Sequence, residues 1–185
     1  MIEDILADDE ERMKKSVEAV QRELTAIRTG HAHVGLVDHV RVEYYGSLLP
    51  VNQMATVAAP EARLLTIQPW DRAALSAIEK ALLKSDLGLT PANDGQIIRL
   101  AIPPLTEQRR KELIKVVHKR VEDGRVAVRN VRRDGLEHVR RLVHDKEISE
   151  DDQRKAETQL QKLTDRYIAN IDQRGRDKEA ELAEV

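Results

Sequence analysis

Residues 106–145, TEQRRKELIKVVHKRVEDGRVAVRNVRRDGLEHVRRLVHD, decide the fold of this 185-residue chain. Apolar side chains recur along the stretch at helical intervals and form one stripe on one face. The stripe consists of Leu113, Val117, Val121, Val128, Val131, Val139 and Leu142. Thr106 follows two prolines and suits the N-cap of a helix that ends near Asp145, about 60 Å away. A rod of this length needs helical partners to bury its stripe.

Two further amphipathic helices are predicted, one near each end of the chain. The first occupies residues 1–30, with apolar residues at steps of three and four, and ends near Gly30. The other begins after Ser149, which together with Asp152 resembles a capping box. It forms an antiparallel hairpin with the helix over 106–145. The three helices predict an elongated three-helix bundle built from residues 1–30 and 105–185.

The middle of the chain has a different composition. All six prolines lie between Pro50 and Pro104, and the segments with strand-like patterns also lie there. These candidate strands are residues 39–45, 53–58, 63–68 and 96–102. One helix, capped by Asp71, interrupts them. The fold class is therefore α+β, a bundle with an inserted small β/α/β domain over 31–104, hinged at 28–31 and 103–106.

Composition excludes several classes of protein. The chain has no cysteine, which rules out disulfides and thiolate metal sites, and it has no Phe, one Trp and three Tyr. No signal peptide or membrane-spanning run is evident, so we expect a cytoplasmic protein. Among the aromatic residues, strand alternation places one of Tyr44 and Tyr45 inside and the other outside. Packing of Trp70 between the sheet and its helix is favoured over a binding role.

The net charge of −2 conceals a strong segregation of charge. Residues 106–146 carry 13 basic and 7 acidic side chains, a local charge of +6. At 100° per residue the cations of this helix gather within an arc of about 100° beside the apolar stripe. This basic ridge consists of Lys111, Lys115, Arg125, Arg129, Arg132, Arg133 and Arg140.

The ridge allows two interpretations. One is a solvated charged face that Glu122, Asp134 and Glu137 partly neutralise. The other is a surface that binds RNA phosphates, since planar guanidinium groups on a straight helix match them well. The clustering of arginine in VAVRNVRRD, residues 126–134, favours RNA.

No catalytic or metal-binding motif supports an enzyme. The glycines form no phosphate-binding loop, and the histidines show no H-E-x-x-H pattern. His31 and His33 lie two residues apart near the first hinge, where packing is favoured over a metal site. We therefore expect no catalytic residue, no metal and no cofactor.

Several motifs in order along the whole chain resemble the bacterial ribosome recycling factors. They are IRTGHA, VEYYG, SDLGLTP, IPPLTEQRRK, VAVRNVRRD and KEISEDD. The resemblance implies a two-domain L shape of transfer-RNA-like dimensions. It also implies that the chain dismantles the post-termination complex with elongation factor G, which itself hydrolyses the GTP. The implied partners are the ribosome, chiefly large-subunit ribosomal RNA, and this elongation factor. We expect a monomer. The alternative from another class is an adaptor whose helical bundle binds protein partners.

The resemblance also implies which residues act. The residues that look equivalent to the family's RNA-binding positions are Arg28, Arg109, Arg110, Arg129, Arg132 and Arg133, and Arg125 joins them by its position on the helix. The implied hinge consists of Thr29, Gly30, Pro103, Pro104 and Leu105.

Two positions depart from the family's pattern. His31 stands where arginine is usual, and Gly124 stands where a better helix former is common. Gly124 and Gly135 each cost a helix up to about 1 kcal/mol relative to alanine. We therefore expect a slight bend in the helix over 106–145.

Overall fold

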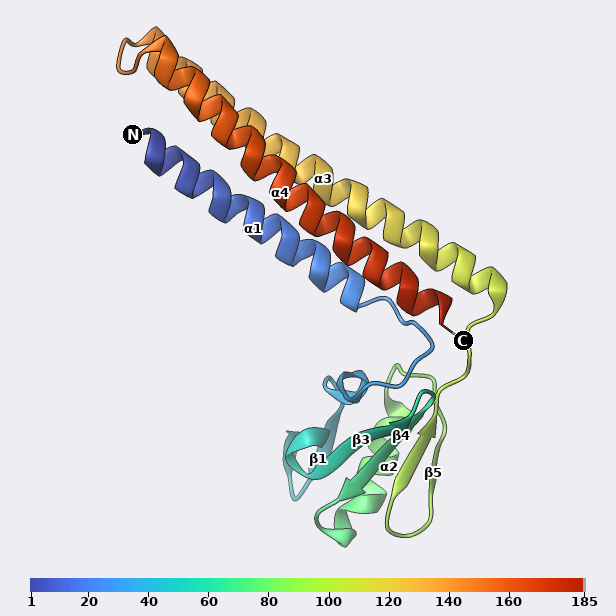
Figure 1. Ribbon diagram of the computed structural model, residues 1–185. Coiled ribbons are helices and arrows are strands. Elements are labelled where there is room, and N and C mark those ends of the chain that lie inside the picture. The colour runs from blue at the N-terminus through green and yellow to red at the C-terminus, as the bar shows by residue number, and fades with distance from the viewer. Residues whose placement is uncertain (185) are drawn as a thin grey trace. The chain divides into compact units, whose positions relative to one another are not determined.

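The computed structural model describes residues 1–184 and divides the chain into two compact units. The first unit comprises Met1–Arg28 and Thr106–Val185, and the second comprises Thr29–Leu105. In the first unit α1 (Ile2–Thr25), α3 (Glu107–His144) and α4 (Glu150–Ala183) each pack against the other two (Figure 1). The predicted three-helix bundle and the α+β class are confirmed.

The helix boundaries follow from local capping. The Thr106 hydroxyl accepts a hydrogen bond from the backbone N–H of Arg109, and α3 begins there. The capping box between Ser149 and Asp152 is present with both of its bonds, and it lowers the pKa of Asp152. Helix α1 ends at Thr25 rather than near Gly30. The chain leaves the helix earlier because Gly30, with φ of 77°, belongs to the second unit, where it packs against Leu105.

The glycines of the bundle lie where helices approach closely. A β-carbon on Gly124 would lie 2.3 Å from Val20 Cγ2, and one on Gly175 would lie 2.6 Å from Val121 Cγ2. Both glycines are buried, and α3 runs without interruption through Gly124. Gly124 of α3 therefore lets α1 come close, and Gly175 of α4 lets α4 come close to α3. The slight bend expected in α3 stays a prediction.

Gly135 faces an unusual neighbour, the buried carboxylate of Asp9 on α1. A β-carbon at position 135 would lie 2.0 Å from Asp9 Oδ2. Asp9 is only 4% exposed, and its Oδ2 has no hydrogen-bond partner, whereas Oδ1 lies 3.9 Å from the Arg12 guanidinium. Burial is the main reason that the pKa of Asp9 rises to about 6, and Arg12 opposes the rise. The oxygen occupies the space that glycine leaves free.

The second unit holds two antiparallel sheets and one α-helix. The sheets have the strand orders β1-β2 and β3-β4-β6-β5. The strands are β1 (Arg41–Tyr44), β2 (Ser47–Pro50), β3 (Ala55–Glu61), β4 (Leu64–Pro69), β5 (Pro91–Asn93) and β6 (Ile98–Ala101), and the helix is α2 (Leu75–Lys84). Short 3-10 turns occupy Val34–Val37, Val51–Gln53 and Arg72–Ala74. Ile67, Ile78 and Ile98 are fully buried in one shared core.

The expected role of Trp70 is wrong. The side chain is 66% exposed and donates a hydrogen bond from Nε1 to Thr56 Oγ1 at 2.9 Å. Leu65 and Ile67 of β4 point into the core, so alternation along the strand turns Trp70 outward. Tyr45 is exposed because it lies in the two-residue turn after β1, with φ of 49°.

Exchanging Gly135 for alanine tests the contact with Asp9. In the otherwise unchanged chain we expect Gly135→Ala to lower the free energy of unfolding by about 1–3 kcal/mol, since the new methyl group displaces the carboxylate. In an Asp9→Ala background the same substitution should cost less, because the contact with the carboxylate is gone and only Leu160 Cδ1, 3.2 Å from the added carbon, still has to shift. Urea denaturation of the wild type, the two single variants and the double variant measures these changes. Equal effects of Gly135→Ala in both backgrounds would contradict this contact.

Asp9 also predicts a pH dependence of stability. Its folded pKa of about 6 exceeds the ordinary value of 3.8, so the folded state binds the extra proton. The raised pKa contributes about 2–3 kcal/mol to the free energy of unfolding below about pH 4, where Asp9 is protonated in both states. This contribution is lost as the pH rises through the folded pKa of about 6. We expect the stability of the wild type relative to Asp9→Asn to fall over this window and to stay level from pH 6.5 to 8. A constant difference from pH 4 to 8 would show that Asp9 titrates normally.

Candidate nucleic-acid interface

The basic ridge lies on the side of α3 that borders α4. Arg125 of the ridge bonds Asp172 of α4, with distances of 2.7 Å from Nε and 2.6 Å from Nη2 to Oδ1. Arg132 donates from Nη1 to the side-chain oxygen of Gln161 at 3.0 Å. Two side chains of α4 therefore hold two ridge arginines along the line where the helices meet.

The centre of the ridge is neutralised by acids. Glu122 accepts hydrogen bonds from Arg125 at 3.0 Å and from Arg129 at 3.4 Å. The bond from Arg125 is the main cause of the lowered pKa of Glu122, and the same bond raises the pKa of Arg125. Arg125 thus bonds two carboxylates, those of Glu122 and Asp172. For the centre of the ridge, the structure fits the interpretation as a solvated charged face.

The distal part of the ridge carries unpaired positive charge. We define it as Arg132, Arg133 and Arg140, none of which is bonded to a carboxylate in the part of the chain that the structure describes. The two acids that were expected to neutralise this part do not reach it. Asp134 bonds Arg12 of α1 at 3.0 Å, and Glu137 bonds Arg141 at 2.7 Å.

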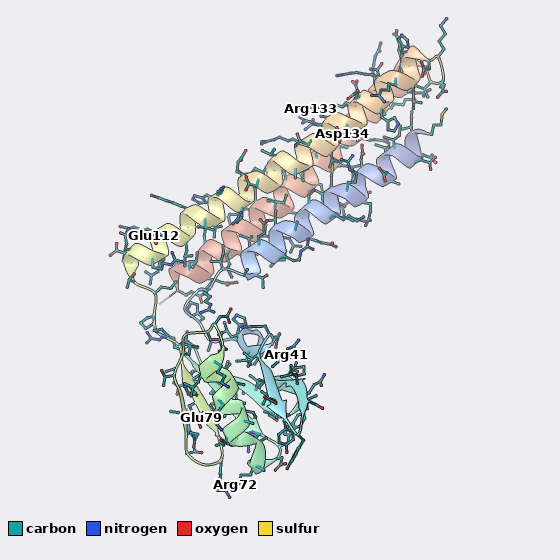
Figure 2. The ribbon with its side chains drawn as sticks, turned by 180° about the vertical axis from the view of Figure 1, so that it is seen from behind. Arg41, Arg72, Glu79, Glu112, Arg133 and Asp134 are labelled. Atoms are coloured by element: carbon teal, nitrogen blue, oxygen red, sulfur yellow. The ribbon has the colours of Figure 1, made fainter. Side chains whose placement is uncertain are left out.

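Helix geometry explains this separation of charge. Arg133 and Asp134, neighbours in sequence, leave α3 in different directions (Figure 2). Successive residues on a helix differ by about 100°, so Asp134 lies on the flank toward α1 while the ridge lies on the flank toward α4. Arg132 is half-buried, and its Nε has no partner. The distal ridge thus presents guanidinium groups that remain available to an outside anion.

The remaining predicted RNA-binding residues lie off the ridge. Arg109 is exposed and bonds Glu112 at 3.1 Å, which lowers the pKa of that acid. Arg110 is half-buried, and its Nε lacks a partner. At 100° per residue these two arginines lie about 160° and about 60° around α3 from Arg125. Arg28 lies beyond the end of α1. The structure therefore brings Arg125, Arg129, Arg132 and Arg133 together, but not Arg28, Arg109 and Arg110.

Sequence reasoning missed the contribution of α4 to this surface. Asp172 and Gln161 are eleven residues apart, and eleven residues return a helix to nearly the same direction. That spacing puts both side chains on the same side of α4, and this much could be read from the sequence. That this side borders the ridge follows only from their contacts with Arg125 and Arg132.

Residues 1–184 lack the side-chain groupings that a metal centre would need. No group of three or more His, Cys, Asp or Glu side chains could hold a metal ion there. His31 lies with Nδ1 3.4 Å from the hydroxyl of Thr29. In the same range, no helix is long and apolar enough to cross a bilayer.

Comparison with known proteins settles the family. The family model described as ribosome recycling factor matches residues 20–182. The chain belongs to the ribosome recycling factor family. The recycling factor of Thermomicrobium roseum is 54% identical over 185 residues, with 100% of both chains covered. That of Nitratidesulfovibrio vulgaris is 55% identical over 184 residues, with 100% of this chain and 99% of the relative covered. The resemblance predicted from sequence is confirmed.

Solved structures agree with this assignment. A solution structure of the ribosome recycling factor is 44% identical and matches with a TM-score of 0.79, covering 100% of this chain and 98% of the other. A second match has 45% identity and a TM-score of 0.66 over both full chains. It is the T. thermophilus ribosome recycling factor, bound with E. coli elongation factor G to the E. coli post-termination complex. The family consists of translation factors that are not enzymes.

The two kinds of ridge arginine should differ in their effect on stability. We expect Arg125→Ala to lower the free energy of unfolding by about 1 kcal/mol, because it leaves the half-buried Asp172 without its partner. Arg133→Ala should change it by less than about 0.5 kcal/mol, since this exposed side chain forms no hydrogen bond or salt bridge within residues 1–184. Urea denaturation at low and high salt measures both. Equal losses for the two variants would mean that the division of the ridge is wrong.

Proposed function

We propose that this chain recycles ribosomes, binding large-subunit ribosomal RNA through the ridge of α3. The distal ridge supports this role most strongly, because it holds three guanidinium groups on one rigid helix and none of them bonds a carboxylate of residues 1–184. Folded RNA is recognised largely through phosphates and shape, so a straight rod with spaced cations suits it. Family membership supports the ribosome as the particle that is bound.

We assign the ridge residues unequal roles within this proposal. Arg132 and Arg133 make the strongest phosphate contacts, and Arg129 adds to them with its long bond to Glu122. Arg125 holds α3 against α4 and positions its neighbours. Arg28, Arg109 and Arg110 contact RNA at the end of the bundle where the chain enters the second unit.

The proposed partners and conditions follow from the relatives. A T. thermophilus recycling factor has been described together with E. coli elongation factor G on the post-termination complex. We infer that this chain also acts with elongation factor G in the cytoplasm, as a monomer without a cofactor of its own. The GTP is then hydrolysed by the elongation factor, and the ribosome is released from messenger RNA for another round.

The connections between the two units support a hinge. Both connectors are anchored to the turn between β3 and β4, by bonds from Ala32 N to Ala62 O at 2.7 Å and from Ile102 N to Arg63 O at 2.9 Å. Gly30 of one connector also lies against Leu105 of the other. Two adjacent connectors, formed by Thr29 and Gly30 and by Pro103, Pro104 and Leu105, allow a swing that elongation factor G drives.

Replacing Arg132 tests the ribosome-binding role. We expect Arg132→Ala to weaken binding to 70S ribosomes by about 1–3 kcal/mol, the range for a charged hydrogen bond to phosphate, while the melting temperature changes little. Co-sedimentation over a series of ribosome concentrations measures the affinity. Arg141→Ala, on the opposite flank of α3, serves as the matched control. An unchanged affinity, or binding that does not respond to salt, would instead favour an adaptor for protein partners.

A reversible crosslink tests the hinge. The chain lacks cysteine, so Ala26→Cys in the bundle with Ala62→Cys in the second unit introduces one pair of exposed thiols, one on each unit. A bis-maleimide reagent that contains a disulfide joins the two units and is cleaved by dithiothreitol. We expect the crosslinked protein to bind ribosomes as the untreated protein does and to lose subunit splitting with elongation factor G and GTP. Cleavage with dithiothreitol should restore splitting, and the two single-cysteine variants control for the substitutions. Splitting at the same rate before and after cleavage would make the swing dispensable.

A further inference from the structure

A groove of about 840 Å³ opens in the second unit between strand β1 and helix α2. Its floor on the helix side includes the methyl groups of Ala77 and Ala81, and Leu48, which is 69% exposed, lies at its rim. Strand β1 contributes Arg41 and Glu43, whereas β2 contributes Leu48 alone. The groove therefore follows β1 rather than β2.

The backbone of β1 has free hydrogen-bonding groups on this side. Among the described strands, β1 pairs only with β2, in a two-stranded hairpin closed by Tyr45 and Gly46, both with positive φ. In such a hairpin the residues that flank the turn form a hydrogen-bonded pair, and bonded and non-bonded pairs alternate from there. Glu43 and Arg41 fall at non-bonded positions opposite Leu48 and Pro50. Their N–H and C=O groups consequently point away from β2.

The charged side chains that line the groove are three cations and the two carboxylates of Glu43 and Asp86. Arg41, Lys80 and Lys84 line it, and none of the three forms a salt bridge within residues 1–184. Arg41 donates only to the backbone oxygen of Asp38, at 2.8 Å. Of the two acids at the groove, Asp86 bonds His39 at 2.8 Å. A segment that carries carboxylates complements this arrangement.

We propose that this groove binds an extended acidic segment of a protein partner, which adds to the free edge of β1 as a third strand. Strand addition beside a helix uses backbone hydrogen bonds for affinity and side-chain pockets for selectivity. Alternate residues of the bound segment face the alanine floor, and carboxylates meet Lys80, Lys84 and Arg41. The groove has no Phe, Tyr or Trp on which nucleic-acid bases would stack. The site is independent of the ridge on α3, so it stands whether or not the ridge binds RNA.

Selection from a library of random decapeptides displayed on phage tests the proposal with the full-length protein. We expect the enriched peptides to be acidic, with apolar residues at alternate positions. Fluorescence anisotropy then measures the affinity of a selected peptide. Lys80→Glu combined with Lys84→Glu should weaken it at least tenfold. The control, Lys14→Glu with Lys15→Glu on α1, makes the same change of charge at exposed lysines away from the groove and should change the affinity less than twofold.

Methylating alternate backbone amides of the selected peptide tests strand addition directly. One register of N-methylation should abolish binding and the other should leave it intact, because only alternate amides face β1. Enrichment of peptides without acidic character, equal affinity for the groove variant, or equal effects of the two N-methyl registers would overturn the proposal. Binding of an oligouridylate that depends on Lys80 and Lys84, with no acidic peptide selected, would also overturn it.

Discussion

The bundle depends on the close contact that α3 makes with α1 and α4 at residues without a β-carbon. Gly124 leaves room for Val20, and Gly175 leaves room for Val121, so the helices approach more closely than side chains would otherwise allow. Close packing along both partners holds α3 in one unbroken helix of 38 residues. The positions of the ridge arginines are fixed by this packing, since side chains on a rigid helix keep their spacing without a cost in ordering at binding.

The distribution of charge follows from the same packing. Because α4 lies beside the ridge, Asp172 and Gln161 reach Arg125 and Arg132. Because α1 lies on the other side of α3, Asp134 pairs with Arg12 of α1 and does not neutralise the ridge. The near-zero net charge of the chain therefore coexists with a local surface of unpaired arginines, and it is the local field that an RNA phosphate meets.

The sequence predicted most of the bundle because its signals are local. Apolar periodicity and the caps at Thr106 and Ser149 specify helices with little help from distant residues. Strands β2 and β5 could not be predicted in the same way, since they have four and three residues and show no clean alternation. The role of Gly124 was also beyond the sequence, because it depends on which side chain of α1 lies opposite. Helix propensity alone predicts that Gly124 destabilises α3, whereas the structure shows that it makes room for Val20 of α1.

The basic ridge of α3 was predictable in part. Its residues on α3 follow from the helical repeat, but the division into a neutralised centre and a distal part without carboxylates requires the neighbours on α1 and α4. Trp70, one residue beyond β4, shows the same limit, since its exposure depends on which face of the strand packs on the core. Pairings between helices and the register of short strands are long-range properties, and a single sequence specifies them weakly.

The salt dependence of ribosome binding shows whether the distal ridge contacts RNA phosphates. Each phosphate contact contributes about 0.7–0.9 to the slope of log affinity against log salt concentration. Arg133→Ala with Arg140→Ala should therefore reduce the magnitude of this slope by about 1.4–1.8. Arg120→Ala with Arg141→Ala, on the other flank of the same helix, should leave it unchanged. If both double variants keep the wild-type slope, the distal ridge does not contact RNA.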